Sequence, residues 1–199
     1  MGQPALEFWF EFASTYSYPA AFRVDEVANE SGVDVVWRPF LLGPIFKSQG
    51  WDTSPFNIYE TKGRYMWRDI ERTCARYRLP YKRPRVMPQN GLLAARVACC
   101  FDDAPWVREF VRQMYQANFV HNLDISSVST LGSVLEALDV DADATFAAAS
   151  TDESKAKLRA QTERAVEIGI FGAPTFVAGE ELFWGHDRLE EAVEWAANR

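Results

Sequence analysis

The stretch Phe8-Trp-Phe-Glu-Phe-Ala-Ser-Thr-Tyr-Ser-Tyr-Pro19 decides the fold of this chain. Alternating aromatic residues that end at small polar ones are typical of a β-strand, and a serine shortly before a proline is typical of a helix start. The sequence therefore predicts a strand that stops near Ser14 and passes directly into a helix. Because a helix N-terminus carries unpaired N–H groups and a partial positive charge, this junction favours an anion.

The two ends of the chain carry an α/β pattern. A helix over residues 19–31 and a strand over residues 33–39 follow the first strand, which predicts a right-handed βαβ unit. Near the other end, two short apolar runs, residues 171–178 and 181–184, flank a glycine and predict a hairpin. A closing helix with an apolar face follows them.

The middle of the chain is predicted to be helical. Residues 40–61 contain many Gly, Pro and Ser residues, which predicts a loop with room for one short helix. Residues 64–78 form an amphipathic pattern, and further helical patterns run to residue 168. We therefore expect residues 45–168 to be an inserted α-helical subdomain between the two parts of an α/β domain, residues 1–44 and 169–199.

Composition indicates a soluble protein with a sizeable core. The chain has 199 residues, 48% of them hydrophobic, and we find no apolar window long enough to span a membrane. The first seven residues lack the basic start of a signal peptide, so we expect a cytoplasmic protein without membrane contact. The three cysteines, Cys74, Cys99 and Cys100, have no metal-ligand spacing, and we expect them to be reduced, buried small hydrophobes.

The net charge of −7 is unevenly distributed. Residues 62–85 contain nine basic and two acidic side chains, a local balance of +7, so the rest of the chain carries −14. A nucleic-acid-binding protein is rarely so acidic elsewhere, which argues against that class of partner. An anionic small molecule fits better, although a solvated helix face explains most of these basic residues equally well.

The first strand and turn resemble those of the DsbA-like branch of the thioredoxin superfamily, in particular its 2-hydroxychromene-2-carboxylate isomerase and kappa-class glutathione transferase group. The resemblance implies an α/β, thioredoxin-like fold (β-α-β, helices, β-β-α) with a large α-helical insertion. Redox members carry Cys-x-x-Cys at this turn, whereas this chain has Ser14-Thr15-Tyr16-Ser17. Thiol–disulfide exchange needs a thiolate, so residue type excludes that chemistry here.

The resemblance also implies a cofactor, glutathione, and a set of site residues. Ser14 matches the catalytic serine that contacts the glutathione sulfur, although a serine satisfied by its local backbone is the alternative. Ala173 and Pro174 resemble the loop in which a cis-proline faces the active-site turn, where a plain turn proline is the alternative. The remaining cofactor contacts that the resemblance implies are Trp184, Gly185, His186, Asp187 and Lys62.

Three of these assignments have alternatives of their own. Asp187 would meet the ammonium group of the γ-glutamyl end, but aspartate is also an ordinary helix N-cap. His186 could be a surface histidine. Asn57, Arg64 and Asn90 belong to segments similar to those that contact the second substrate, and Pro88 belongs to a segment that lines the same pocket. Phe46 and Trp67 could form its aromatic wall, but packing in the core is the alternative for both.

Three functions remain open on the sequence. The first is a glutathione-dependent isomerase that interconverts 2-hydroxychromene-2-carboxylate and trans-o-hydroxybenzylidenepyruvate, an aromatic carboxylate substrate. The second is a kappa-like glutathione transferase or peroxidase, and the third is a non-catalytic thioredoxin-fold binding module. Relatives in the group imply a homodimer, and no metal is expected.

Overall fold

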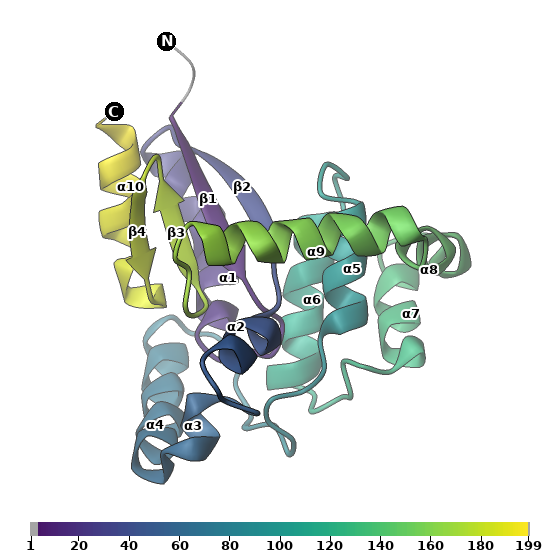
Figure 1. The fold of residues 1–199 in the computed structure, drawn as a ribbon, viewed down its shortest axis with the longest axis horizontal. Coiled ribbons are helices and arrows are strands. Elements are labelled where there is room, and N and C mark those ends of the chain that lie inside the picture. The colour runs from purple at the N-terminus through teal and green to yellow at the C-terminus, as the bar shows by residue number, and fades with distance from the viewer. Residues whose placement is uncertain (1–3, 199) are drawn as a thin grey trace.

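The structure, a computed structural model, describes residues 4–198 and is built around a four-stranded mixed sheet (Figure 1). The strand order is β2 (Asp34–Pro39), β1 (Ala5–Phe10), β3 (Thr175–Ala178), β4 (Glu181–Trp184). β1 runs parallel to β2 and antiparallel to β3, and β3 pairs antiparallel with β4. The predicted βαβ unit and the predicted hairpin are both confirmed.

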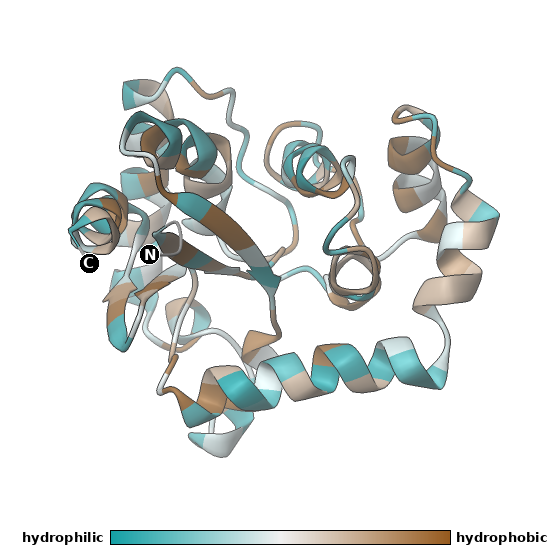
Figure 2. Cartoon of the chain, turned by 90° about the horizontal axis from the view of Figure 1, so that it is seen from above, coloured by the Kyte–Doolittle hydropathy of each residue, from teal (hydrophilic) through white to brown (hydrophobic). Residues whose placement is uncertain are grey.

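Helices cover both faces of the sheet. α1 (Ser17–Glu30) and α10 (Leu189–Ala197) pack on one face and contact each other, while α9 (Asp152–Glu167) crosses the other face (Figure 1). α10 follows a short 3₁₀ helix, η1 (His186–Arg188). Seen from above, α9 carries brown apolar residues among teal hydrophilic ones, as expected for a helix with one solvent-facing side (Figure 2).

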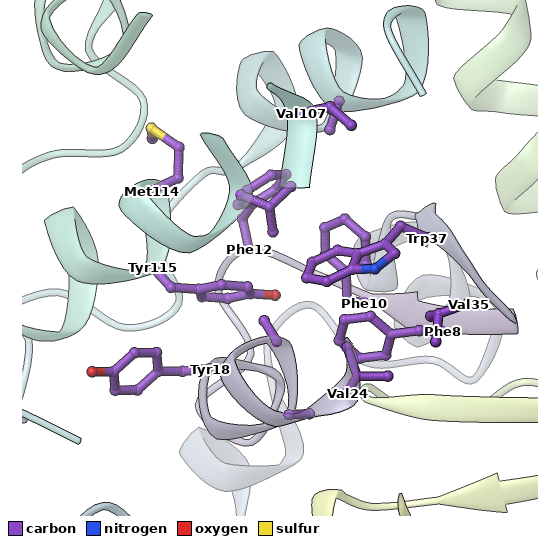
Figure 3. Close-up of a cluster of buried hydrophobic side chains, with 14 of the residues drawn as sticks. Phe8, Phe10, Phe12, Tyr18, Val24, Val35, Trp37, Val107, Met114 and Tyr115 are labelled. Atoms are coloured by element: carbon purple, nitrogen blue, oxygen red, sulfur yellow. The ribbon is translucent and has the colours of Figure 1, made fainter. Parts of the chain in front are cut away.

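Residues of β1 alternate between two buried clusters because successive side chains of a strand point to opposite faces. Phe8 and Phe10 lie in the larger cluster, where both rings contact Trp37 edge-on (Figure 3). Trp9 points the other way, into a smaller cluster with Phe40 and Ala173. Burial of the aromatic run on both faces fixes β1 as the central strand.

The helical middle of the chain follows the prediction closely. The elements are α4 (Glu60–Arg76), α5 (Leu92–Cys100), α6 (Val107–Phe119), α7 (Val128–Glu136) and α8 (Ala142–Ala149). The larger buried cluster continues from the sheet into these helices, as the contact of Phe12 with Phe110 and Tyr115 shows. The division into a thioredoxin-like domain and an inserted subdomain stays a prediction.

The prediction for residues 40–61 was wrong in one respect, because this segment contains two short helices. They are α2 (Leu42–Ser48) and α3 (Pro55–Ile58). Pro44 lies in the first turn of α2 and Pro55 begins α3, where the missing N–H of proline has no helical partner to lose. Prolines that we interpreted as helix breakers are therefore helix starts.

Gly63 allows α4 to lie against α3. A Cβ added at Gly63 would lie 2.2 Å from the backbone oxygen of Phe56, so the two helices would have to separate. We expect Gly63→Ala to lower the free energy of unfolding by about 1–3 kcal/mol, as overpacking does. Gly132→Ala in α7 is the matched control, because its added Cβ meets nothing nearer than 3.9 Å. Urea unfolding of both variants checks this, and equal stability of the two would contradict it.

The architecture is an α/β fold with the element order β-α-β, helices, β-β-α, as predicted. Within residues 4–198, every helix is too short or too polar to cross a membrane.

Candidate active site

The register of the sheet brings the two ends of the chain together at Ser14. β1 ends at Phe10 and β3 begins at Thr175, and because these strands are antiparallel, Trp9 pairs with Thr175. The turn after β1 and the loop before β3 therefore lie at the same edge. Ser14 and Ala173, which are 159 residues apart, meet in a hydrogen bond there.

The Ser14 hydroxyl is nearly buried and makes two hydrogen bonds. It donates to the backbone oxygen of Ala173 over 2.8 Å and accepts the backbone N–H of Ser17 over 3.2 Å. Because the Ser14 oxygen already accepts an N–H, the group that Ser14 can donate to a partner is its hydroxyl proton. One of the two bonds is thus the local backbone contact that the alternative describes, and the other ties the turn to the proline loop.

The turn also holds backbone donors that the described part of the chain does not use. The N–H of Ala13 donates to the Glu11 carboxylate, and the N–H of Ser14 donates to the Glu11 carbonyl. No hydrogen bond within residues 4–198 involves the N–H of Thr15 or Tyr16. These two groups, at the start of α1, are suited to bind an anion.

The Ala173–Pro174 peptide bond is cis, as the resemblance implied. The carbonyl of Pro174 accepts the N–H of Gly185, which ties the proline loop to the end of β4. Gly185 has φ of 115°, a conformation that favours glycine, and a Cβ there would lie 2.5 Å from Asp187 Oδ1. The three segments at this edge are thus fixed to one another.

A cavity of about 670 Å³ opens in front of Ser14. Its wall is mostly aromatic and apolar, formed by the Ser14 turn, α2, α3, the start of α5 and the proline loop. The ring side chains in this wall include Tyr16, Phe46, Trp51, Phe56, Phe171 and Trp184. Such a size and lining are typical of small-molecule sites.

Three charged side chains of the described residues line the cavity, namely Glu11, Asp52 and Lys62. Lys62 comes from α4, and its Nζ lies 5.6 Å from the centroid of the Phe56 ring. No ion pair with Lys62 is present within residues 4–198. Lys62 is therefore a cation that an anionic ligand could pair with.

Glu11 is the cavity residue that the sequence interpretation missed. Burial raises the pKa of its carboxyl from 4.5 to about 7, and the N–H groups of Ala13 and Ser14 only partly offset this. The available signal was an acidic residue inside an aromatic run. Because we interpreted that run as a strand with a simple end, its one carboxyl received no role.

Five of the predicted site residues line the cavity. They are Ser14, Ala173, Trp184, Lys62 and Asn90. Asn90 uses its Oδ1 to accept the N–H of Leu92 at the start of α5, over 3.0 Å. Phe46 and Pro88, predicted as pocket lining, also lie in this wall.

The segment after Trp184 turns away from the cavity. Gly185, His186 and Asp187 are absent from its described lining, as is Pro174. The side chain of His186 is 13% exposed and its Nε2 lies 3.1 Å from Thr73 Oγ1, so the surface-histidine alternative is wrong. The N-cap alternative for Asp187 is also wrong, since α10 begins at Leu189 and Arg188 occupies its N-cap.

Asn57 and Arg64 make contacts outside the cavity. Asn57 donates to Thr53 Oγ1 and to the carbonyl of Met87, over 3.1 and 3.0 Å. Arg64 pairs with Glu60, one turn earlier on α4. Trp67, the remaining predicted wall residue, lies under the guanidinium of Arg83. None of the three lines the cavity in the described structure.

The cysteines lie away from this turn. Cys74 and Cys99 are buried, as predicted, and Cys100 is half-buried. Desolvation raises the pKa of the Cys74 thiol to about 12 and that of Cys99 to about 11. No group of three or more His, Cys, Asp or Glu side chains that could hold a metal is found among the residues described.

Comparisons with known proteins agree with this architecture. A 2-hydroxychromene-2-carboxylate isomerase of Sphingobium xenophagum is 26% identical over 186 residues, which covers 93% of this chain and 94% of the relative. Human glutathione S-transferase kappa 1 is 24% identical over 199 residues, which covers 93% of this chain and 87% of the relative. The solved structure of a 2-hydroxychromene-2-carboxylate isomerase superposes with a TM-score of 0.86 at 24% identity, covering 98% of this chain and 95% of that one.

These relatives carry the two names that the sequence resemblance suggested. Residues 5–194, almost the whole chain, match the DSBA-like thioredoxin domain. The cis-proline opposite the strand-to-helix turn is where that resemblance placed it. The chain therefore belongs to the DSBA-like thioredoxin domain family.

Proposed function

We propose that this protein is a glutathione-dependent isomerase of the 2-hydroxychromene-2-carboxylate type. The observation that carries the proposal is the Ser14 hydroxyl at the end of an apolar cavity, bonded across to the proline loop. Bound glutathione would supply a sulfur nucleophile that adds to a conjugated double bond, allows rotation about the resulting single bond and then leaves. Relatives named as this isomerase support the choice.

The residues present fit glutathione. Ser14 offers a hydroxyl proton, and the N–H groups of Thr15 and Tyr16 have no partner in the described residues. A free thiol is mostly protonated at neutral pH, and such donors stabilise its anion. Ala173 lies two residues before β3, where its backbone can pair with an added peptide strand. For that pairing, Ser14 must release the carbonyl of Ala173 and turn its proton toward the sulfur.

The second candidate is a kappa-like glutathione transferase or peroxidase that uses the same residues. Relatives named glutathione S-transferase kappa favour it. One experiment separates the two: the protein is incubated with glutathione and either a hydroxychromene carboxylate or a chloronitrobenzene. An isomerase leaves the thiol concentration unchanged while the absorption spectrum of the carboxylate changes, whereas a transferase consumes one thiol for each product formed.

Calorimetry tests the third possibility, a non-catalytic binding module. Absence of heat and of a thermal shift with millimolar glutathione would favour the module over both enzymes. We also propose that the protein is not a dithiol oxidoreductase, because Ser14 and Ser17 stand where that chemistry needs thiols. Failure to reduce insulin in the presence of dithiothreitol is the expected result.

Lys62 is proposed to bind a carboxylate of glutathione. Lys62→Gln is expected to raise KM for glutathione about 10-fold with little change in kcat, because the lost charge pair acts equally in ground and transition states. High salt should raise the KM of the wild type for glutathione toward that of the variant, because salt screens the charge pair. The control is Lys47→Gln on α2, which does not line the cavity. Equal KM values for the two variants would refute the assignment.

A further inference from the structure

Glu11 lies in the cavity beside the proposed sulfur position. It follows β1 directly, and the N–H of Ser14 donates to the Glu11 carbonyl over 3.0 Å, which folds Ser14 back onto Glu11. Both residues line the same cavity. The carboxyl is anchored on one side only: its Oε2 accepts the N–H of Ala13 over 2.9 Å, and its Oε1 has no hydrogen bond within residues 4–198.

Room for this carboxyl comes from Gly91, the N-cap of α5. A Cβ on Gly91 would lie 2.7 Å from the Cβ of Phe12 and 3.5 Å from Oε1 of Glu11. Any larger residue would therefore crowd the end of β1 and the carboxyl together. Gly91 itself also lines the cavity, so the Glu11 carboxyl lies beside the N-terminus of α5 at the cavity wall.

The other charged and titratable groups around Glu11 leave its carboxyl without a cation. Tyr115 of α6 donates its hydroxyl to the Glu11 carbonyl over 2.9 Å, not to the carboxyl. Tyr16, Asp52 and Lys62 also line the cavity, and none of them forms a hydrogen bond or ion pair with Glu11 within residues 4–198. No ion pair with Glu11 is found among the residues described, and burial is the main influence on its titration. A buried carboxyl with one hydrogen bond and no cation nearby holds its proton up to near neutral pH, so it can exchange that proton with a bound ligand.

We propose that Glu11 is the proton-transfer residue of this cavity, accepting the thiol proton of bound glutathione and returning it to the substrate. This inference rests on the proposed function. The pKa of about 7 supports it, because a group that must both take and give a proton works best near the operating pH. The pKa of an ordinary thiol is only about 1.5 units higher than that of Glu11, so the proton can move in either direction at a small cost in free energy.

The proton inventory closes over one cycle. Glu11 carboxylate takes the proton as the thiol becomes a thiolate. When the carbon–sulfur bond forms, the electron pair of the double bond moves to the conjugated carbonyl oxygen, and Glu11 gives the proton to that oxygen. On elimination Glu11 takes it back, the double bond reforms, the carbon–sulfur bond breaks and the sulfur keeps its electron pair. No proton or electron is gained or lost.

The decisive measurement is the titration of Glu11 in the wild-type protein. With ¹³C-labelled glutamate, one carboxyl resonance, absent in Glu11→Gln, is expected to titrate near pH 7. Glutathione should move that midpoint by more than S-methylglutathione does, since only the former brings a proton that the carboxyl can share. Equal titration with both ligands would overturn the proposal. Glu11→Asp identifies the resonance if the amide variant fails to fold.

Kinetics provide the second test. Glu11→Gln keeps an oxygen for the N–H of Ala13, and it should lower kcat by about 10²-fold or more while glutathione affinity changes by less than about 3-fold. Formate should partly restore the activity of Glu11→Ala, which a packing defect would not allow. If Glu11→Gln turns over as fast as the wild type, the proton-transfer role of Glu11 is refuted, but the proposed function is not. Absence of glutathione binding to the wild-type protein would refute the proposed function as well.

Discussion

Ser14→Ala is expected to lower isomerase turnover by about 10²-fold, the usual cost of removing one donor to a developing anion. Its effect on the binding of glutathione should be smaller. The Ser14 hydroxyl donates to Ala173 in the free protein, so on binding it exchanges one acceptor for another. Only the reacting thiolate gains fully from its proton, so the loss falls on kcat. Steady-state kinetics combined with calorimetric titration separate the two quantities.

The control for this prediction has the same hydrogen-bond pattern elsewhere. Thr162 of α9 is buried, donates its hydroxyl to the Leu158 carbonyl over 3.0 Å and accepts the N–H of Leu41 over 3.3 Å. Thr162 does not line the cavity, and Thr162→Val removes both bonds at a cost in stability of about 1 kcal/mol each. If both variants lose turnover equally, the hydroxyl of Ser14 has only a structural role.

Glu11→Gln is expected to be more stable than the wild type at pH 8, by about 3 kcal/mol. The folded protein raises the pKa of Glu11 from 4.5 to about 7, so the folded state holds the proton more tightly than the unfolded state. Below pH 4.5 both states are protonated, and the wild type has no disadvantage. As the pH rises toward 7, the unfolded state ionises first and the wild type loses stability, reaching a plateau above pH 7.

Urea unfolding at pH 4 and pH 8 measures this difference. The two proteins should be nearly equally stable at pH 4 and should diverge at pH 8. Glu163→Gln, which removes a carboxylate at an exposed position on α9, is the control with the same change of charge. A stability difference that stays constant across this range would mean that Glu11 is not held in a desolvated site.

Much of the fold could be predicted because its signals are local and repeated. The aromatic run of β1, the helix that follows and the final hairpin each have a distinct period and distinct ends, and all appear in the structure. Ser150-Thr-Asp-Glu153 has the form of a capping box, but the structure begins α9 one residue later than that pattern predicts. Thr151 caps α9 instead, by accepting the N–H of Ser154. Hydroxyl residues next to each other compete for such a position, and sequence alone does not choose between them.

The site was only partly predictable. Ser14 and Ala173 followed from their places at strand ends and from the resemblance, and they meet as expected. Arg64 was assigned to the substrate because its segment resembles one that contacts the second substrate, but Arg64 pairs with Glu60 one turn earlier. Helical spacing predicts that pair as readily as a pocket residue. His186 lies in a packed contact with Tyr16 and Thr73, which depends on how η1 meets α4 and has no local signal.

The hydrogen bond between Ser14 and Ala173 joins residues 159 positions apart. During synthesis, therefore, the Ser14 turn is made first, and the proline loop that faces it is made only after the whole helical segment. A nascent or truncated chain that ends before β3 keeps the serine turn but has no surface opposite it. Competence to bind at this edge is acquired late and in one step, together with the closing of the sheet.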